Sequence, residues 1–140
     1  MIFFSLKVDL FGSILFFIVL IMTIVLGNFF HFYENFFWWD RLSHFLFGIV
    51  SISFGVAIAH KLGFSNKFSI VLFSFTFAIT LQTFWEVFEY LTDLIFHTNN
   101  QRWKGETVAN AQPAGLVDTM NDTIFYMVGS LITCLVRWFR

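Results

Sequence analysis

The stretch FSIVLFSFTFAITLQTFWEVFEYLTD, residues 68–93, decides the fold class of this 140-residue chain. Its first 18 residues, 68–85, carry no charged side chain. A helix needs about 20 predominantly apolar residues to cross the hydrocarbon core of a bilayer. The stretch then ends in three carboxylates, those of Glu86, Glu89 and Asp93. It therefore predicts a membrane-spanning helix with an acidic face at one end.

The composition of the whole chain also indicates a membrane protein. Hydrophobic residues make up 58% of the chain and charged residues only 12%, whereas charged residues are about 25% of an average soluble domain. Two more long stretches, 10–30 and 42–60, lack Asp, Glu, Lys and Arg. A fourth uncharged stretch, 123–136, is only 14 residues long. A helix of that length covers about 21 Å of a core about 30 Å thick. The fourth span must therefore include polar residues next to it.

These stretches predict an all-α polytopic membrane protein, a bundle of four transmembrane helices in one domain over residues 1–140. The expected helices cover residues 8–30, 41–60, 68–96 and 116–137. The first apolar stretch is too long for a signal peptide and lacks a small-x-small cleavage site, so we expect this helix to be retained. The single cysteine excludes an internal disulfide.

Lysine and arginine predict the orientation, because cytoplasmic loops carry an excess of both. With four spans, the two termini and the turn between the second and third spans share one side. We expect this side to be the cytoplasm of a bacterial cell, with the loop 97–115 on the extracytoplasmic side of the cytoplasmic membrane. The basic residues divide as Lys7, Lys61, Lys67, Arg137 and Arg140 on the side of the termini, and Arg41, Arg102 and Lys104 on the other.

An acidic stripe marks the extracytoplasmic end of the third span. Gln82, Glu86, Glu89 and Asp93 are spaced i, i+4, i+7 and i+11, so they lie on one face of a helix. The negative end of the helix dipole disfavours anions there, so a positive group is expected nearby. The plain alternative is that these carboxylates emerge into water beyond the span.

Two other expected helices begin at the same level with a pair of polar residues one turn apart. The pairs are Asp40 with His44, and Asp118 with Asp122. In the plain alternative, the first aspartate of each pair is only a helix N-cap. A seam of small residues follows His44 on its own face, which lets a neighbouring helix approach and directs His44 into the bundle. The seam consists of Gly48, Ser51 and Gly55.

Carboxylates crowded at one level cannot all stay ionised without compensation, so we expect the site to hold protons, a bound cation or both. Carboxylate oxygens with one imidazole suit a divalent ion such as Mg²⁺, Mn²⁺, Zn²⁺ or Fe²⁺. The expected metal ligands are Glu86, Glu89, Asp122 and His44.

The same residues, together with Asp118, form the candidate catalytic group, in which His44 acts as a ligand or a general base. Arg41 and Asp93 are the expected substrate-binding residues, and Arg41 is placed to hold an anionic head group. The chain has no Gly-x-Ser-x-Gly motif, so nucleophilic catalysis finds little support.

Three segments carry a resemblance to a known family. They are DRLSHFLFG (residues 40–48), WEVFEYLTD (85–93) and GLVDTMNDTIFYMVG (115–129). Similar Asp-Arg/Lys-x-x-His-Phe, Glu-x-x-Glu and Asp-Thr-x-x-Asp blocks occur in the bacterial YjdF-like family of small multi-span membrane proteins, which this chain resembles. More distantly it resembles the VanZ-like proteins. The resemblance implies a site but no reaction, and it points to Asp40, His44, Glu86, Glu89, Asp93, Asp118, Asp122 and Gly129.

The sequence thus predicts an integral membrane protein with an acidic cation site around His44 at the extracytoplasmic face. We expect it to act on a lipid-linked or cell-envelope substrate within the lipid bilayer. With a net charge of −1, no nucleic-acid partner is expected. Two alternatives stay open: a small ion-coupled transporter whose acids relay protons or cations, and a structural or immunity-type membrane protein. A polar seam that reached the inner face would favour transport.

Overall fold

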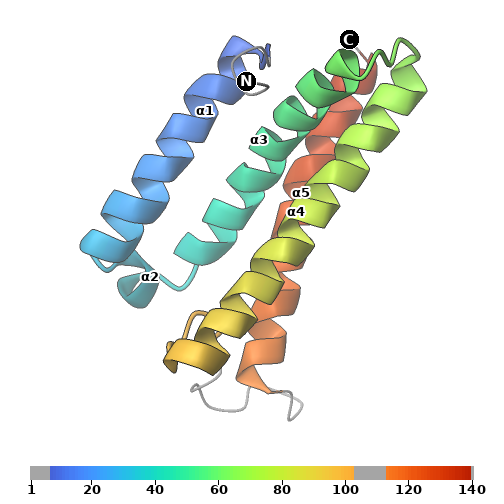
Figure 1. Cartoon of the computed structure of the whole chain (residues 1–140). Coiled ribbons are helices and arrows are strands. Elements are labelled where there is room, and N and C mark those ends of the chain that lie inside the picture. The colour runs from blue at the N-terminus through green and yellow to red at the C-terminus, as the bar shows by residue number, and fades with distance from the viewer. Residues whose placement is uncertain (1–6, 103–112, 140) are drawn as a thin grey trace.

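The computed structural model describes residues 7–102 and 113–139, and every regular element within them is helical. Four helices are long and apolar enough to cross a membrane, which confirms the all-α polytopic fold (Figure 1). The first of them continues without a break from an α-helix into a π-helix. The elements are α1 (Leu10–Leu20), η2 (Ile21–Phe29), α2 (Phe32–Asn35), α3 (Trp39–Lys61), α4 (Lys67–Phe96) and α5 (Ala114–Phe139).

The short helix α2 was not expected from the sequence. His31 has a positive φ of 58°, a left-handed conformation that ends the first span. The amide of Asn35 donates a hydrogen bond of 3.0 Å back to the carbonyl oxygen of His31, and this closes the turn. Of the expected loop 97–115, the structure describes residues 97–102 and 113–115, and Ala114 and Gly115 already belong to α5. Residues 103–112 lie outside the described chain.

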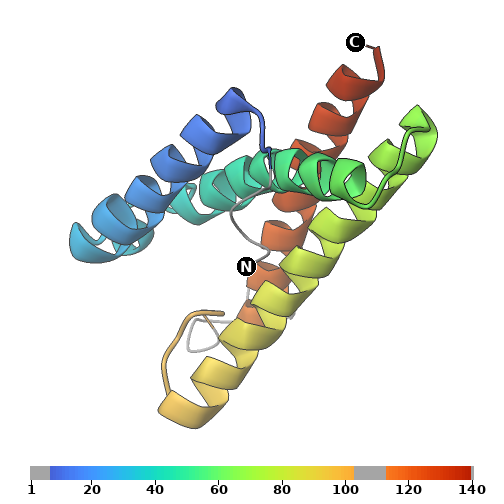
Figure 2. The same cartoon turned by 45° about the horizontal axis from the view of Figure 1, so that its top comes forward.

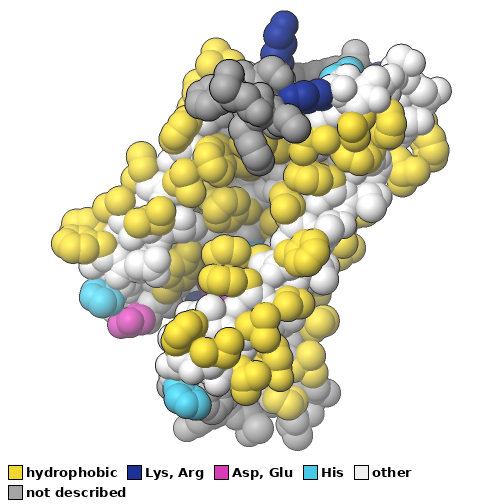
Figure 3. Space-filling view, in the orientation of Figure 1, with side chains coloured by type: hydrophobic (Ala, Val, Ile, Leu, Met, Phe, Trp, Pro, Cys, Tyr) yellow, Lys and Arg dark blue, Asp and Glu magenta, His cyan; other side chains and the backbone are white. Residues whose placement is uncertain are grey.

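Helix α3 lies at the centre of the bundle (Figure 2). It contacts α1, α4 and α5, whereas α1 contacts neither α4 nor α5 among the described residues. More than half of the most apolar window of α3 is buried, 56%, against 17% for the first span and for α4. The outer helices therefore turn large apolar side chains outward, as helices in lipid do, and these side chains cover much of the face seen in Figure 3.

Glycines bring α3 and α5 into backbone contact. A Cβ atom at Gly48 would collide with the carbonyl oxygen of Tyr126, and one at Gly129 would collide with the carbonyl oxygen of Phe45. Both helices start at the same end of the molecule and run in the same direction (Figure 1). One turn before Gly48 and Tyr126 come His44 and Asp122, so this packing sets those two side chains at one level.

The opposite end of the bundle is tied by Arg137, in the last turn of α5. Its guanidinium bonds the carboxylate of Asp9 and donates a 2.8 Å hydrogen bond to Ser53 of α3. Asp9 is also the N-cap of α1, where it accepts a 2.7 Å hydrogen bond from the N–H of Gly12. The start of the first span and the end of the last are thus joined, which places both on the same side of the bundle (Figure 1).

Candidate functional site

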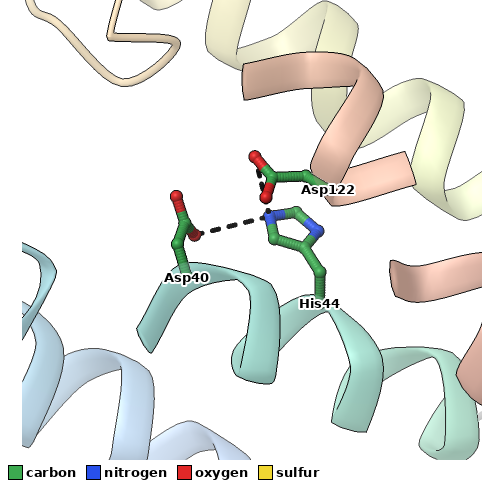
Figure 4. Close-up of side chains that lie close together, drawn as sticks. All are labelled: Asp40, His44 and Asp122. Atoms are coloured by element: carbon green, nitrogen blue, oxygen red, sulfur yellow. Dashed lines mark ion pairs between the residues drawn. The ribbon is translucent and has the colours of Figure 1, made fainter. Parts of the chain in front are cut away.

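Three side chains from α3 and α5 meet at the end of the bundle that lies away from the termini (Figure 4). The Nε2 atom of His44 lies 3.6 Å from Oδ1 of Asp40 and 3.9 Å from Oδ2 of Asp122. Each residue offers one ligand atom, and the three atoms lie within 4.8 Å of one another. His44 and Asp122 are buried, with 6% and 2% of their surfaces exposed. We call this group the DHD cluster.

A hydrogen-bond chain on α4 orients the imidazole of His44. The amide nitrogen of Gln82 donates to Oε1 of Glu86 at 2.6 Å, so Oε1 of Gln82 is left to accept from Nδ1 of His44 at 3.2 Å. An Nδ1–H that donates to Gln82 leaves Nε2 of a neutral imidazole with a free electron pair facing Asp40 and Asp122. The second oxygen of Glu86, Oε2, is buried and makes no hydrogen bond within the described part of the chain.

Among the described residues, Arg102, from the segment that follows α4, is the cation that forms ion pairs with these acids. Its Nη2 atom lies 3.2 Å from Oδ2 of Asp40, and its Nε lies 3.6 Å from Oδ1 of Asp118. Arg41, the residue expected to hold an anionic head group, donates to the carbonyl oxygen of Phe37 at 3.3 Å, and its guanidinium lies 5.9 Å from the centre of the Phe37 ring.

Asp93 folds the segment that carries Arg102. Its carboxylate accepts hydrogen bonds from the hydroxyl of Thr98 and from the backbone N–H groups of Asn100 and Gln101, the latter two at 2.8 and 2.9 Å. The segment starts at His97, which takes a left-handed φ of 56° at the end of α4. The structure thus places Asp93, an expected substrate-binding residue, in a cap that turns the chain back toward the DHD cluster.

The two expected ligands on α4 lie beside the DHD cluster and not in it. Glu86 reaches His44 only through Gln82. Glu89 is half-buried and accepts a 2.8 Å hydrogen bond from the indole N–H of Trp85. Neither carboxylate contributes a ligand atom to the group of three.

Tyr33 of α2 also faces the site, and the sequence offered no signal for it. Burial raises the pKa of its phenol to about 12, and the negative charges of Asp40, Glu89 and Asp122 act in the same direction. Ser43, one residue before His44, acts on this pKa in the opposite direction. Tyr33 therefore keeps its proton throughout the physiological pH range and closes the side of the site that faces the first span.

The fold and this group define an integral membrane protein with ionisable side chains buried inside its helix bundle. The chain belongs to the family described as predicted membrane proteins, DUF2238, whose family model matches residues 2–140. This membership is consistent with the resemblance to YjdF-like proteins, whereas the likeness to VanZ-like proteins rests on sequence motifs alone.

A protein of Thermotoga maritima described as "Uncharacterized protein" is 32% identical over 110 residues. The matched region covers 75% of this chain and 50% of that protein, so the chain spans about half the length of this curated relative. No solved structure matches the chain significantly.

Proposed function

We propose that the protein binds a divalent transition-metal ion through Asp40, His44 and Asp122, at the extracytoplasmic end of the helix bundle. The observation that supports this proposal most is the convergence of three ligand atoms within 4.8 Å of one another, on two buried side chains and the half-buried Asp40. Ionisable side chains inside a membrane bundle are costly, and they generally mark a functional site.

The distances within the DHD cluster favour an ion over a hydrogen-bonded ion pair. At 3.6 and 3.9 Å, His44 lies too far from either aspartate for a hydrogen bond. Zinc bonds of about 2.0–2.2 Å put neighbouring tetrahedral ligands about 3.3–3.6 Å apart. The three ligand atoms, which lie within 4.8 Å of one another, would draw closer together around an ion.

The surroundings of His44 match those of a metal ligand. A histidine that binds a metal through one ring nitrogen usually donates its other N–H to a neighbouring acceptor, which fixes the ring. Oε1 of Gln82 is such an acceptor, and Gln82 is itself held by Glu86. One imidazole with two carboxylates suits Zn²⁺, Mn²⁺ or Fe²⁺ better than Ca²⁺, which prefers oxygen ligands alone.

Three protein ligands leave coordination positions open for a substrate oxygen. Arg102 adds a guanidinium beside these positions, and a third of its side chain is exposed, 33%. Guanidinium groups bind phosphate and carboxylate well. The substrate class that fits is an anionic head group of a lipid-linked or cell-envelope molecule, held between the ion and Arg102.

Metal content of the purified protein tests the proposal. We expect the protein in detergent to hold about one Zn²⁺ or Mn²⁺ per chain after dialysis against each ion, and Asp122→Asn to hold far less. A chelator should lower the melting temperature of the parent protein and leave that of Asp122→Asn unchanged, because a bound ion stabilises the folded state.

The matched control is Glu34→Gln, since Glu34 pairs with His31 at 3.4 Å in an exposed position outside the cluster. This variant should keep the metal content of the parent. Equal metal content in Asp122→Asn and the parent would contradict the assignment of the ligands, and a parent without metal would contradict the proposed function.

A second candidate function is ion-coupled transport, because buried polar groups continue along α3 and α5 away from the DHD cluster. The hydroxyl of Tyr126 donates to Ser51, and that of Ser130 donates to the carbonyl oxygen of Gly48 at 3.2 Å. Ser53, further on, bonds Arg137 at the opposite end. Such a line of polar groups suits a relay of protons or cations.

Proteoliposomes loaded with a pH-sensitive dye test this candidate. Transport predicts acidification under an inward proton gradient at a rate above that of protein-free liposomes, and a clearly lower rate for Tyr126→Phe. The control is Thr80→Val, a substitution on the exposed face of α4. A rate equal to that of protein-free liposomes would exclude proton transport. The metal site would then be the function that the buried polar groups support.

A further inference from the structure

A second site lies at the other end of the bundle, on the side of the termini. A groove of about 750 Å³ runs between the start of the first span, α3, the start of α4 and the end of α5. It lies where α1 leaves α4 and α5 uncovered. Its walls are mainly apolar, formed by Ile49, Val56, Ile70, Val71, Ile132 and Val136.

The groove has the depth of one bilayer leaflet. Along α3 its lining runs from Ile49 to His60, and the eleven helical steps between them rise about 16 Å. This is about half of a hydrocarbon core about 30 Å thick. The apolar part of the groove therefore extends from the interface on the side of the termini to the middle of the membrane.

Three basic side chains surround the interfacial end of the groove. His60 lies in the last turn of α3, Lys67 is the first residue of α4, and Arg137 lies in the last turn of α5. All three line the groove, and the acid that lines it with them is Asp9. The excess of basic groups favours an anionic occupant.

Arg137 and Lys67 can each still interact with an anionic occupant of the groove. Arg137 uses its Nη2 atom for Asp9 and Ser53, while its Nε is buried and has no hydrogen-bond partner in the described chain. The ammonium group of Lys67 lies 5.8 Å from the centre of the Trp138 ring, and the residue is exposed. Trp138 is thus placed to sit at the interface beside a lipid head group, where tryptophan is enriched.

We propose that this groove binds one anionic phospholipid of the surrounding membrane, with an acyl chain against Val56 and Ile132. The phosphate of its head group is held by Lys67, with His60 and Arg137 beside it. Basic pockets between transmembrane helices bind anionic lipid head groups in this way. The site stands at the opposite end of the bundle from the DHD cluster and does not depend on the proposed metal site.

Lipid binding by the detergent-purified protein tests the proposal through native mass spectrometry. Dioleoyl-phosphatidylglycerol is the anionic probe and dioleoyl-phosphatidylcholine the zwitterionic comparison. We expect the first complex with phosphatidylglycerol to form several-fold more readily than that with phosphatidylcholine. Lys67→Gln should weaken phosphatidylglycerol binding about fivefold, which corresponds to the roughly 1 kcal/mol contributed by one basic residue near a charged lipid.

Two matched controls separate the groove from its surroundings. Lys61→Gln removes a charge at the same end of the bundle but outside the groove, so it should leave the binding unchanged. Ile132→Trp fills the groove and should weaken binding of both lipids, whereas Ile124→Trp, on an exposed part of the same helix, should not.

Each other outcome contradicts the proposal. Equal effects of Lys67→Gln and Lys61→Gln would mean that phosphatidylglycerol is attracted by the overall positive charge at this end of the bundle and not by the groove. Equal binding of the two lipids by the parent would mean that the groove does not select an anionic head group. Full competition by glycerol phosphate, which has no acyl chain, would mean that a free phosphate binds and that the apolar groove plays no part.

Discussion

At the scale of single residues, Gln82 connects the two acidic parts of the site. Its amide donates to Glu86 and accepts from His44, so the direction of one side chain sets which ring nitrogen of His44 carries the proton. Only 2% of Gln82 is exposed, and water does not reach it to take over either bond. An acidic group on α4 thereby influences the proposed metal ligand on α3 without itself belonging to the DHD cluster.

A substitution at Gln82 separates this orienting role from ligation. We expect Gln82→Met, which keeps the length of the side chain, to lower metal affinity by about 10- to 100-fold, as for other residues that orient a ligand. Competition with a chromogenic chelator would measure the dissociation constant. The control is Thr83→Val, whose hydroxyl bonds only the backbone of α4 in an exposed position. An unchanged affinity in Gln82→Met would mean that His44 needs no such partner.

Arg102 shows why some of the site could not be predicted from the sequence. His44 and Asp122 were expected as ligands from i, i+4 spacing at helix ends, which is local information, and the same spacing paired Asp40 with His44 without making Asp40 an expected ligand. Arg102 reaches Asp40, 62 positions away, only because Asp93 caps the chain after α4. Helical periodicity carries no signal for such a turn, so nothing in the sequence indicated that Arg102 would contact these acids.

At the scale of elements, the contact between α3 and α5 sets the geometry of the site. It depends on Gly48 and Gly129, where each helix has no room for a Cβ atom beside the backbone of the other. Because van der Waals packing drives helix association in lipid, small residues at such contacts have large effects. The level of His44 relative to Asp122 follows from this packing.

Replacing Gly129 tests the link between packing and site. We expect Gly129→Leu to push α5 away from α3, destabilise the protein by about 1–3 kcal/mol or more and reduce metal content with it. Thermal melting in detergent and metal analysis of the folded fraction would measure both. Val128→Leu changes the neighbouring residue on an exposed face and should melt like the parent. If Gly129→Leu also melted like the parent, the close contact between the helices would not be needed.

The helices themselves were largely predictable, since a run of uncharged residues long enough to span a bilayer depends on composition alone. The π-helical geometry of Ile21–Phe29 and the short α2 were not predictable in this way. The first involves Gly27, which packs against the ring of Tyr33, and the second involves the left-handed His31. Both are tertiary or backbone features that a hydropathy pattern does not contain.

At the scale of the whole molecule, the two ends of the bundle differ in charge. The DHD cluster, Glu86, Glu89 and Asp118 gather at one end, while His60, Lys67 and Arg137 surround the groove at the other. The four spans place both described chain ends on the basic side (Figure 1). From the positive-inside rule we expect the acidic site at the extracytoplasmic face and the groove in the inner leaflet.

Reporter fusions test this orientation. Green fluorescent protein joined after Arg140 should fluoresce, because that end is expected in the cytoplasm, and alkaline phosphatase at the same position should be inactive. Truncation after Asn100, followed by the same two reporters, should give the opposite pattern, since three spans separate that position from the N-terminus. The two fusion points serve as controls for each other, because each must favour one reporter only. The reversed result at both points would mean that the protein has the opposite orientation in the membrane. The acidic site would then draw its metal ion from the cytoplasm, and the basic groove would face lipids of the outer leaflet.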